Sequence, residues 1–153
     1  MKNKYFAIGI ICAKSTSLRF PGKNVYIHDG EPLFFHSVKP LLESKSVGEV
    51  YVSTDSTIII EYCKINKIKY IQRNINVTQN EEPLLSVLKY SYQTLDISSE
   101  YICTIMANCP GHNAKVIDDA LELMKNNDLN EIRSFNNDGI ESGLIILKEK
   151  ILL

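Results

Sequence analysis

The chain has 153 residues and a mass of 17.4 kDa, which is the size of one domain with a single hydrophobic core. Its hydrophobic content of 44% and charged content of 23% are ordinary for a globular protein. A formal net charge of −1 argues against broad binding to nucleic acids or to membrane surfaces. We therefore expect one domain over residues 1–153, with no nucleic acid and no membrane among its partners.

The cysteines are dispersed, with no Cys-x-x-Cys pair and no histidine at zinc spacing; they are Cys12, Cys63, Cys103 and Cys109. Four free thiols are typical of a reducing compartment, so we expect a cytoplasmic protein. The start of the chain, Met1–Ala13, also has the charged and then apolar pattern of a secretion signal. However, Ala13-Lys14-Ser15 is a poor cleavage site, and the same run fits a buried strand equally well.

The first half of the chain alternates between strand and helix patterns. The apolar run from Tyr5 to Cys12 predicts a first strand, and Asp29-Gly30 predicts a turn. Glu31-Pro32 opens a predicted helix, which Pro40 should kink or shorten. Glu49–Ser53 then reads as the second strand.

The next unit begins at Thr54-Asp55-Ser56, a cluster that predicts the N-cap of a helix over Thr57–Asn66. Within that cluster we expect Asp55 to be a helix cap rather than a catalyst. Ile68–Gln72 predicts the third strand, followed by a polar loop from Asn74 to Asn80 and a helix start at Glu81-Glu82-Pro83. The predicted buried stripe of this helix is Leu84, Leu85, Val87, Leu88 and Leu95.

The last part of the chain predicts a strand over Tyr101–Ala107, a helix over Lys115–Asn126, a polar stretch from Asn127 to Asn137 and a final strand over Gly143–Leu147. The residues expected to face inward from the helix are Val116, Ile117, Ala120, Leu121, Leu123 and Met124. Strands that alternate with helices in this way indicate βαβ units around a mostly parallel sheet. The predicted fold class is therefore α/β, with three α/β/α layers.

One loop, Ala13–Asn24, carries the clearest chemical signal. It contains Lys14, Arg19 and Lys23 and no carboxylate, and the first acidic residue of the chain is Asp29. Because ligands of open α/β sheets bind beyond the carboxyl ends of the strands, this loop is a candidate polyphosphate site. It has neither the dinucleotide-binding nor the Walker glycine pattern.

The loop sequence Ala-Lys-x-x-Ser-x-Arg-x-Pro-Gly-Lys-Asn resembles a known signature, Ala-Arg-x-Gly-Ser-Lys-x-x-Pro-x-Lys-Asn. That signature belongs to the cytidylyltransferases that make CMP-sugars, of the acylneuraminate (CMP-sialic acid) synthetase type, and the spore-coat-polysaccharide group is related. The resemblance continues along most of the chain, at Gly30–Leu33, Val52–Asp55, Arg73, Cys109-Pro110 and Gly143–Ile146.

The resemblance implies a Rossmann-like nucleotidyltransferase fold and the transfer of CMP from CTP to an acidic, sialic-acid-like sugar, with release of pyrophosphate. It implies that Lys23 is the catalytic cation and that Asn108 and His112 lie on the substrate-side loop. The implied nucleotide-binding residues are Ala13, Lys14, Ser15, Ser17, Arg19, Asn24 and Arg73. It also implies a requirement for Mg²⁺, with ligands that the sequence does not identify, and a homodimer.

Two alternatives remain. A catalytically impaired nucleotide-binding relative, or a partner subunit, is favoured by Asn108, which stands where the spore-coat-type branch has Asp, and by Leu18, which stands where the family usually has Lys. In this reading the metal-binding carboxylates of the family would lie beyond Leu153. A flavodoxin-like regulatory or redox domain would need an acidic phospho-acceptor pocket or an FMN loop, and the sequence shows neither.

Overall fold

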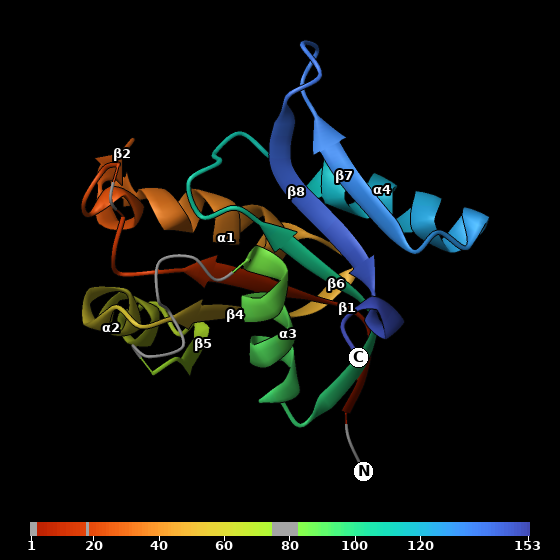
Figure 1. Cartoon of the computed structure of the whole chain (residues 1–153), viewed down its shortest axis with the longest axis horizontal. Helices are drawn as coiled ribbons and strands as arrows, with labels where there is room; N and C mark the ends of the chain where they lie inside the picture. The colour runs from red at the N-terminus through yellow and green to blue at the C-terminus, as the bar shows by residue number, and fades with distance from the viewer. Residues whose placement is uncertain (1–2, 18, 75–82) are drawn as a thin grey trace.

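A six-stranded sheet forms the centre of the computed structural model, which describes residues 3–17, 19–74 and 83–153 (Figure 1). The strand order across the sheet is β5-β4-β1-β6-β8-β7. The strands are β1 (Asn3–Ala13), β4 (Val47–Thr54), β5 (Lys69–Gln72), β6 (Ile97–Ile105), β7 (Glu131–Phe135) and β8 (Glu141–Lys148). The first four strands of this order pair in parallel, and β8 and β7 add an antiparallel edge. The predicted mostly parallel sheet is therefore confirmed.

Strand β1 lies at the centre because its sequence is apolar on both faces. It pairs with β4 on one side and with β6 on the other, and Ala7, Ile8, Ile10, Ile11 and Ala13 are each 0% exposed. A strand that is buried on both faces has a continuous apolar run rather than an alternating one. The last residues paired between β1 and β4 are Ala13 and Thr54, so both strands end at the same edge of the sheet.

Helices cover both faces of the sheet. One apolar core contains side chains of α1 (Leu33–Glu43), α2 (Thr57–Ile65) and α4 (Ala114–Asn127), and a second core contains side chains of α3 (Leu84–Gln93). The predicted three-layer α/β/α arrangement is thus confirmed (Figure 1). The short elements are η1 (Lys23–Val25), β2 (Ile27–His28), β3 (Glu31–Pro32) and η3 (Glu149–Ile151). Within the described part of the chain, no helix is long and apolar enough to cross a membrane.

The polar stretch predicted over Asn127–Asn137 was wrong in part, because it contains strand β7. Residues of β7 alternate between exposed and half-buried rather than between polar and apolar, so the sequence lacks the usual strand pattern. Its pairing with β8, in which Ile132 lies opposite Ile146, stabilises it as an edge strand.

Two helices bury narrower stripes than predicted. Leu85, Val116 and Leu123 were expected inside but are 46%, 42% and 52% exposed. In α4 the buried residues are Ile117, Leu121 and Met124, which follow the spacing of a single helical face.

Helix α1 also differs from the prediction at both ends. Glu31 and Pro32 belong to β3, and the helix begins at Leu33. It continues for three residues beyond Pro40 and ends at Glu43, with Pro40 buried against the core. The predicted turn at Asp29-Gly30 is confirmed, since both residues have positive φ between β2 and β3. Leu18, most of the predicted loop Asn74–Asn80 and the helix-start residues Glu81 and Glu82 lie outside the described residues.

Candidate functional site

The loop after β1 folds back across the sheet edge through a tight turn. Gly22 has a φ of 73°, a left-handed conformation that favours glycine, and it precedes the short helix η1. The N–H of Lys23 donates to the carbonyl of Phe20 at 3.2 Å, and the N–H of Val25 donates to the carbonyl of Gly22 at 3.0 Å. The turn therefore returns Lys23 and Asn24 to the carboxyl end of β1.

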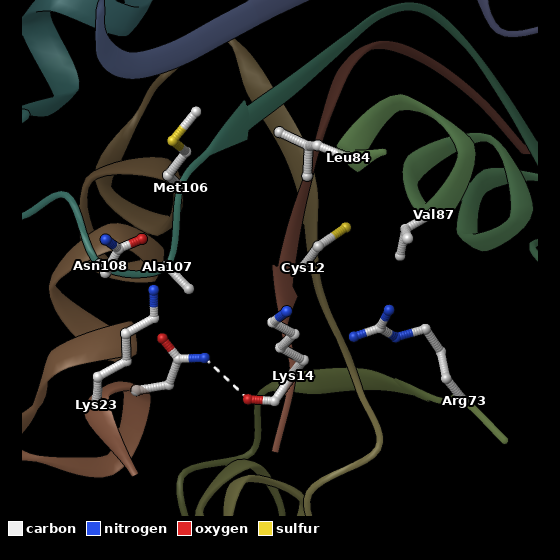
Figure 2. Close-up of a pocket in the computed structure, with 10 residues that line it drawn as sticks. Cys12, Lys14, Lys23, Arg73, Leu84, Val87, Met106, Ala107 and Asn108 are labelled. Carbon is white, nitrogen blue, oxygen red and sulfur yellow. Dashed lines mark hydrogen bonds between the residues drawn. The ribbon is translucent and has the colours of Figure 1, made fainter. Parts of the chain in front are cut away.

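A pocket of about 220 Å³ opens at this edge. Its lining residues come from β1, the returning loop, the end of β5, α3 and the segment after β6; they are Cys12, Lys14, Lys23, Asn24, Arg73, Leu84, Val87, Met106, Ala107 and Asn108. The side chains of Lys14 and Arg73 point toward the same space, and Lys23 extends toward Ala107 and Asn108 (Figure 2). Three of the described lining residues are cations and none is a carboxylate.

Arg73 and Asn24 each bring an unsatisfied polar atom to this pocket. Arg73 is 4% exposed and Asn24 is 6% exposed, and the Nε of Arg73 and the Oδ1 of Asn24 are buried without a hydrogen-bond partner. Burial lowers the pKa of the Arg73 guanidinium, although arginine remains protonated at neutral pH. Buried donors and acceptors normally have partners, so an unpaired donor and an unpaired acceptor in one pocket are suited to a ligand that supplies both.

Asp55 contacts the loop and does not cap the following helix, so the prediction of a cap at this residue was wrong. Its carboxylate accepts hydrogen bonds from the backbone N–H of Ser15 at 2.7 Å and from the Ser15 hydroxyl at 2.9 Å. The N-cap of α2 is Ser56, whose hydroxyl accepts from the N–H of Ile59 at 3.4 Å. The capping cluster was thus predicted correctly, but the individual residue was not.

The structure brings Lys14, Lys23, Asn24, Arg73 and Asn108 together at the first pocket, as the sequence predicted, and places the other predicted residues outside its lining. These other residues are Ala13, Ser15, Ser17, Arg19 and His112. None of them lines the pocket of Figure 2.

Ser15 lines a neighbouring pocket together with Lys14 and Asn24, and the other four residues have separate environments. The side chain of Ala13 is buried in the core, and Arg19 is exposed. The Ser17 hydroxyl accepts from the N–H of Phe20 at 3.4 Å. The Nε2 of His112 lies 2.7 Å from the carbonyl oxygen of Ser142, to which it donates.

Sequence reasoning missed the apolar half of the pocket, which includes Cys12, Leu84, Val87 and Met106. Cys12 was predicted only as the last residue of the first strand, but it is two residues before Lys14 and therefore lies on the same face of the strand. Burial raises the pKa of the Cys12 thiol to about 11, so the group is neutral at physiological pH. That spacing is the signal that could have placed Cys12 in the site.

The segment after β6 is fixed from two sides. The N–H of Met106 donates to the carbonyl of Gly143 at 2.9 Å, and the Met106 carbonyl accepts from the hydroxyl of buried Ser37 at 2.9 Å. A Cβ on Gly143 would lie 2.8 Å from the side chain of Cys109, so only glycine fits there. This wall of the pocket is therefore held rigidly before any ligand binds.

A second pocket of about 140 Å³ adjoins the first and shares Leu84 and Met106 with it. Its other lining residues are Leu85, Leu88, Thr104, Arg133, Glu141, Ile145 and Leu147. Thr104 is 1% exposed, and its hydroxyl has no hydrogen-bond partner.

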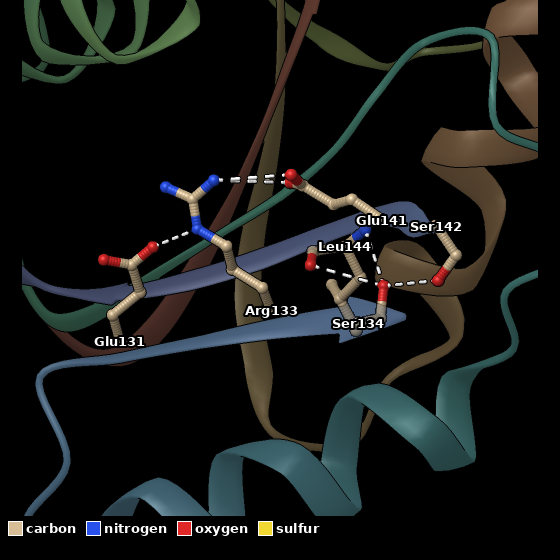
Figure 3. A network of polar contacts seen from close by, with 6 residues as sticks. All are labelled: Glu131, Arg133, Ser134, Glu141, Ser142 and Leu144. Atoms are coloured by element: carbon tan, nitrogen blue, oxygen red, sulfur yellow. Dashed lines mark hydrogen bonds and ion pairs between the residues drawn. The ribbon is translucent and has the colours of Figure 1, made fainter. Parts of the chain in front are cut away.

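Two of the residues that line this second pocket, Arg133 and Glu141, belong to a network of polar contacts between β7 and β8 (Figure 3). Arg133 on β7 pairs with Glu131 on the same strand and, at 3.4 Å, with Glu141 on β8. Beside it, the Ser134 hydroxyl accepts from the N–H of Leu144 at 3.0 Å and from the Ser142 hydroxyl at 2.7 Å. The network joins the two antiparallel strands at the pocket.

The described residues do not form a protein metal site. Among the described lining residues of the first pocket, Asn24 and Asn108 supply the side-chain amide oxygens, and no group of three or more His, Cys, Asp or Glu residues lies together in residues 3–17, 19–74 and 83–153. Asp118 is not available as a ligand, because its carboxylate accepts from the Ser44 hydroxyl at 2.5 Å and from the N–H of Ser46 at 3.1 Å. Mg²⁺ is commonly held by substrate phosphates with few protein ligands, so a metal that arrives with a nucleotide fits this pocket better than a resident ion.

A mostly parallel sheet with a cationic pocket beyond the ends of its central strands defines an α/β protein with a site suited to an anionic ligand. The sequence profile of the cytidylyltransferase family matches residues 8–144, and the chain belongs to this family. The match begins within β1 and ends within β8, so it includes every element that lines the pocket.

Individual relatives agree with this assignment. The N-acylneuraminate cytidylyltransferase of Streptococcus agalactiae is 26% identical over 131 residues, which is 84% of this chain and 32% of that protein. A solved CMP:2-keto-3-deoxy-manno-octonic acid synthetase in complex with CTP superposes with a TM-score of 0.76 at 15% identity, over 95% of this chain and 75% of that one. A Mycobacterium tuberculosis protein solved in complex with manganese has a TM-score of 0.71 at 6% identity, over 95% of this chain and 72% of that one. These two structural similarities show the fold alone.

The chain is shorter than the curated relatives that it matches. It spans between 24% and 53% of their length.

Proposed function

We propose that this chain transfers CMP from CTP to a hydroxyl group of an acidic sugar and releases pyrophosphate. The observation that carries the proposal is the pocket into which Lys14, Lys23 and Arg73 converge without a carboxylate among its described lining residues. In the reaction, the acceptor oxygen forms a bond to the α-phosphorus of CTP as the acceptor hydroxyl loses its proton. The bond from that phosphorus to the bridging oxygen breaks, and pyrophosphate leaves with the electron pair.

Positioned cations suit this chemistry because negative charge on the phosphate oxygens is what must be stabilised. Lys23 and Lys14 are assigned to the triphosphate, with Lys23 as the catalytic cation that the family resemblance implies. Mg²⁺ is assigned to the nucleotide as part of the substrate complex. Lys14 stands where the family signature has Arg, so it supplies a point charge rather than a bidentate contact.

Cytosine complements the two unsatisfied groups of the pocket. Its exocyclic amino group can donate a hydrogen bond to the Oδ1 of Asn24, and its carbonyl oxygen can accept one from the Nε of Arg73. We assign these two residues to the base and ribose end of the nucleotide. Discrimination among bases by a buried hydrogen-bonding site is strong, because the wrong base leaves these polar groups unpaired.

The acceptor sugar is assigned to the second pocket. That pocket adjoins the first through Leu84 and Met106, and its lining combines apolar side chains, the buried and unpartnered hydroxyl of Thr104, and the ion pair of Arg133 and Glu141. The assignment of an acidic sugar rests on the relatives, whose names specify N-acylneuraminate and an octonic acid.

A second candidate function is nucleotide binding without turnover, in an impaired relative or a partner subunit. It is favoured by the amide of Asn108 in the pocket and by the lack of a cluster of potential metal ligands among the described residues. A cytoplasmic location is consistent with the four free cysteines. The homodimer stays a prediction, which light scattering can check.

The test is a pyrophosphate-release assay with Mg²⁺, CTP and a panel of acidic sugars, on the wild type and two lysine variants. Lys23→Ala should lose turnover, whereas Lys39→Ala should not, because Lys39 is an exposed residue of α1 that pairs with Glu43 at 3.9 Å and does not line the pocket. Release that depends on both CTP and a sugar supports the transferase. Binding of CTP with no release for any sugar supports the second candidate instead.

A further inference from the structure

The peptide group between Lys14 and Ser15 is hydrogen-bonded on both sides by distant side chains. Its carbonyl oxygen accepts from the Nδ2 of Asn24 at 2.9 Å (dashed line in Figure 2). Its N–H donates to one carboxylate oxygen of Asp55 at 2.7 Å, and the other oxygen accepts from the Ser15 hydroxyl at 2.9 Å. We call these three bonds the peptide clamp. Together they fix the orientation of the backbone from which the Lys14 side chain projects.

The clamp lies where the sheet stops. Ala13 and Thr54 are the last residues paired between β1 and β4, so Lys14, Ser15 and Asp55 follow directly after the final backbone pair. A loop residue beyond a sheet edge would otherwise keep much of its backbone freedom, and ordering it would oppose ligand binding. Because the clamp orders this backbone when the protein folds, the entropy is not lost on binding, and Lys14 is already in place when a ligand arrives.

We propose that Asp55 is a positioning residue of the nucleotide site, which acts on the ligand only through Lys14. The inference rests on the proposed function, because it takes the pocket to bind CTP. It also gives the donors of Ser15 a role in the clamp rather than at a phosphate, since its N–H and its hydroxyl both bond to Asp55 in this structure.

A purely electrostatic role for Asp55 makes a different prediction. Its negative charge lies at the same sheet edge as Arg73, whose backbone N–H donates to the carbonyl of Thr54 at 2.8 Å. Asparagine at position 55 removes the charge but keeps an oxygen to accept from the Ser15 N–H, and its amide group can donate to the Ser15 hydroxyl. Asp55→Asn therefore tests the negative charge of Asp55 while the hydrogen bonds of the clamp are retained.

The experiment is calorimetric titration of CTP with Mg²⁺ into the wild type, Asp55→Ala, Asp55→Asn and Ser56→Ala. We expect Asp55→Ala to weaken CTP binding about tenfold and Asp55→Asn to stay within about threefold of the wild type. Ser56→Ala is the matched control, because it removes the neighbouring helix cap and leaves the clamp intact. It should lower the melting temperature without changing the CTP dissociation constant.

The Lys14→Ala background tests whether Asp55 acts through Lys14. There, adding Asp55→Ala should cost little further affinity, because the side chain that the clamp positions is gone. Unchanged CTP affinity in Asp55→Ala would overturn the proposal. It would also be overturned if Asp55→Ala weakened CTP binding equally in the wild-type and Lys14→Ala backgrounds. A loss of CTP affinity in Asp55→Asn as large as in Asp55→Ala would overturn it as well.

A wild type that binds no CTP would overturn the proposed function. In that case, amide hydrogen exchange still tests whether the peptide clamp exists. The Ser15 amide should exchange slowly in the wild type and in Asp55→Asn, and faster in Asp55→Ala. Fast exchange of this amide in the wild type would overturn the clamp itself.

Discussion

Asn24 reaches from η1 to the backbone just beyond the end of β1, where its Nδ2 donates to the carbonyl oxygen of Lys14 at 2.9 Å. This bond joins the two ends of the loop that carries Lys14 and Lys23. The other amide atom of Asn24, Oδ1, is buried in the pocket and has no partner. One side chain thus combines a structural bond with a buried acceptor that has no partner.

We predict that Asn24→Ala lowers both stability and nucleotide affinity. Loss of the bond leaves the Lys14 carbonyl unsatisfied and should cost about 1–2 kcal/mol in the free energy of unfolding, with CTP binding about tenfold weaker. Denaturant unfolding and calorimetry measure the two effects. Asn66→Ala is the matched control, because Asn66 makes an equivalent bond to the carbonyl of Tyr62 at 2.9 Å on the exposed surface. Loss of CTP affinity in that control would contradict the assignment.

Arg73→Met should separate binding from stability. The buried guanidinium is partly unsatisfied, and its desolvation opposes folding in the absence of ligand. A methionine of similar length should therefore leave the melting temperature unchanged or raise it, while CTP binding weakens about tenfold or more. Thermal denaturation and titration of the same sample provide the comparison. A large fall in melting temperature with normal CTP affinity would show that Arg73 is structural.

Cys12 should react slowly with iodoacetamide at neutral pH. Its pKa is raised from 9.0 to about 11, mainly by burial, so the nucleophilic thiolate is scarce below pH 9. Alkylation of Cys12, located by peptide mass spectrometry, should accelerate as the pH rises toward 11 and should be suppressed by CTP, because Cys12 lines the pocket. Rapid labelling at pH 7, or labelling at high pH that saturating CTP does not slow, would contradict this placement.

Asp118 should stabilise the fold in a pH-dependent way. Burial tends to raise its pKa, but hydrogen bonds from Ser44, Lys45 and Ser46 outweigh burial and lower the pKa below its usual value of 3.8. Because the folded-state pKa is the lower one, this stabilisation is present above about pH 4 and is lost as the pH falls further.

Asp118→Asn should lower the free energy of unfolding by about 1–3 kcal/mol at pH 7. This difference in stability between variant and wild type, the gap, should shrink toward pH 3. Urea unfolding at a series of pH values measures the gap. Asp119→Asn is the control, because Asp119 forms an exposed ion pair with Lys115 at 2.5 Å, and its substitution should have little effect on stability. A gap that stays constant with pH would contradict the carboxylate's role.

The sequence predicted the features of this protein that arise from local pattern. The apolar run of β1, the glycine and proline signals at the turns and the cationic loop indicated the parallel sheet and the position of Lys14 and Lys23. It could not predict β7, because Glu131 and Arg133 alternate with residues that are only half-buried, and the strand forms by pairing with β8. Nor could it predict the bond between Ser15 and Asp55, which are 40 residues apart and meet only because β1 and β4 end together.

The pocket residues, too, could be predicted from the sequence only in part. Lys23, Asn24 and Arg73 were found by resemblance to a known signature, whereas Cys12 and Met106 were missed. Buried positions next to a site have no compositional signature that separates them from core positions. Their role depends on which strand ends lie side by side, and that is decided by the strand order of the whole sheet.

The most direct measurement is calorimetric titration of the wild type and of Lys23→Ala with each of the four nucleoside triphosphates, in the presence and absence of Mg²⁺. The assigned site predicts that the wild type binds CTP in preference to the other three, that Mg²⁺ strengthens binding, and that Lys23→Ala loses it while remaining folded. A wild type that binds none of the four, or a Lys23→Ala variant that binds CTP as tightly as the wild type, would contradict the assignment of this pocket to CTP.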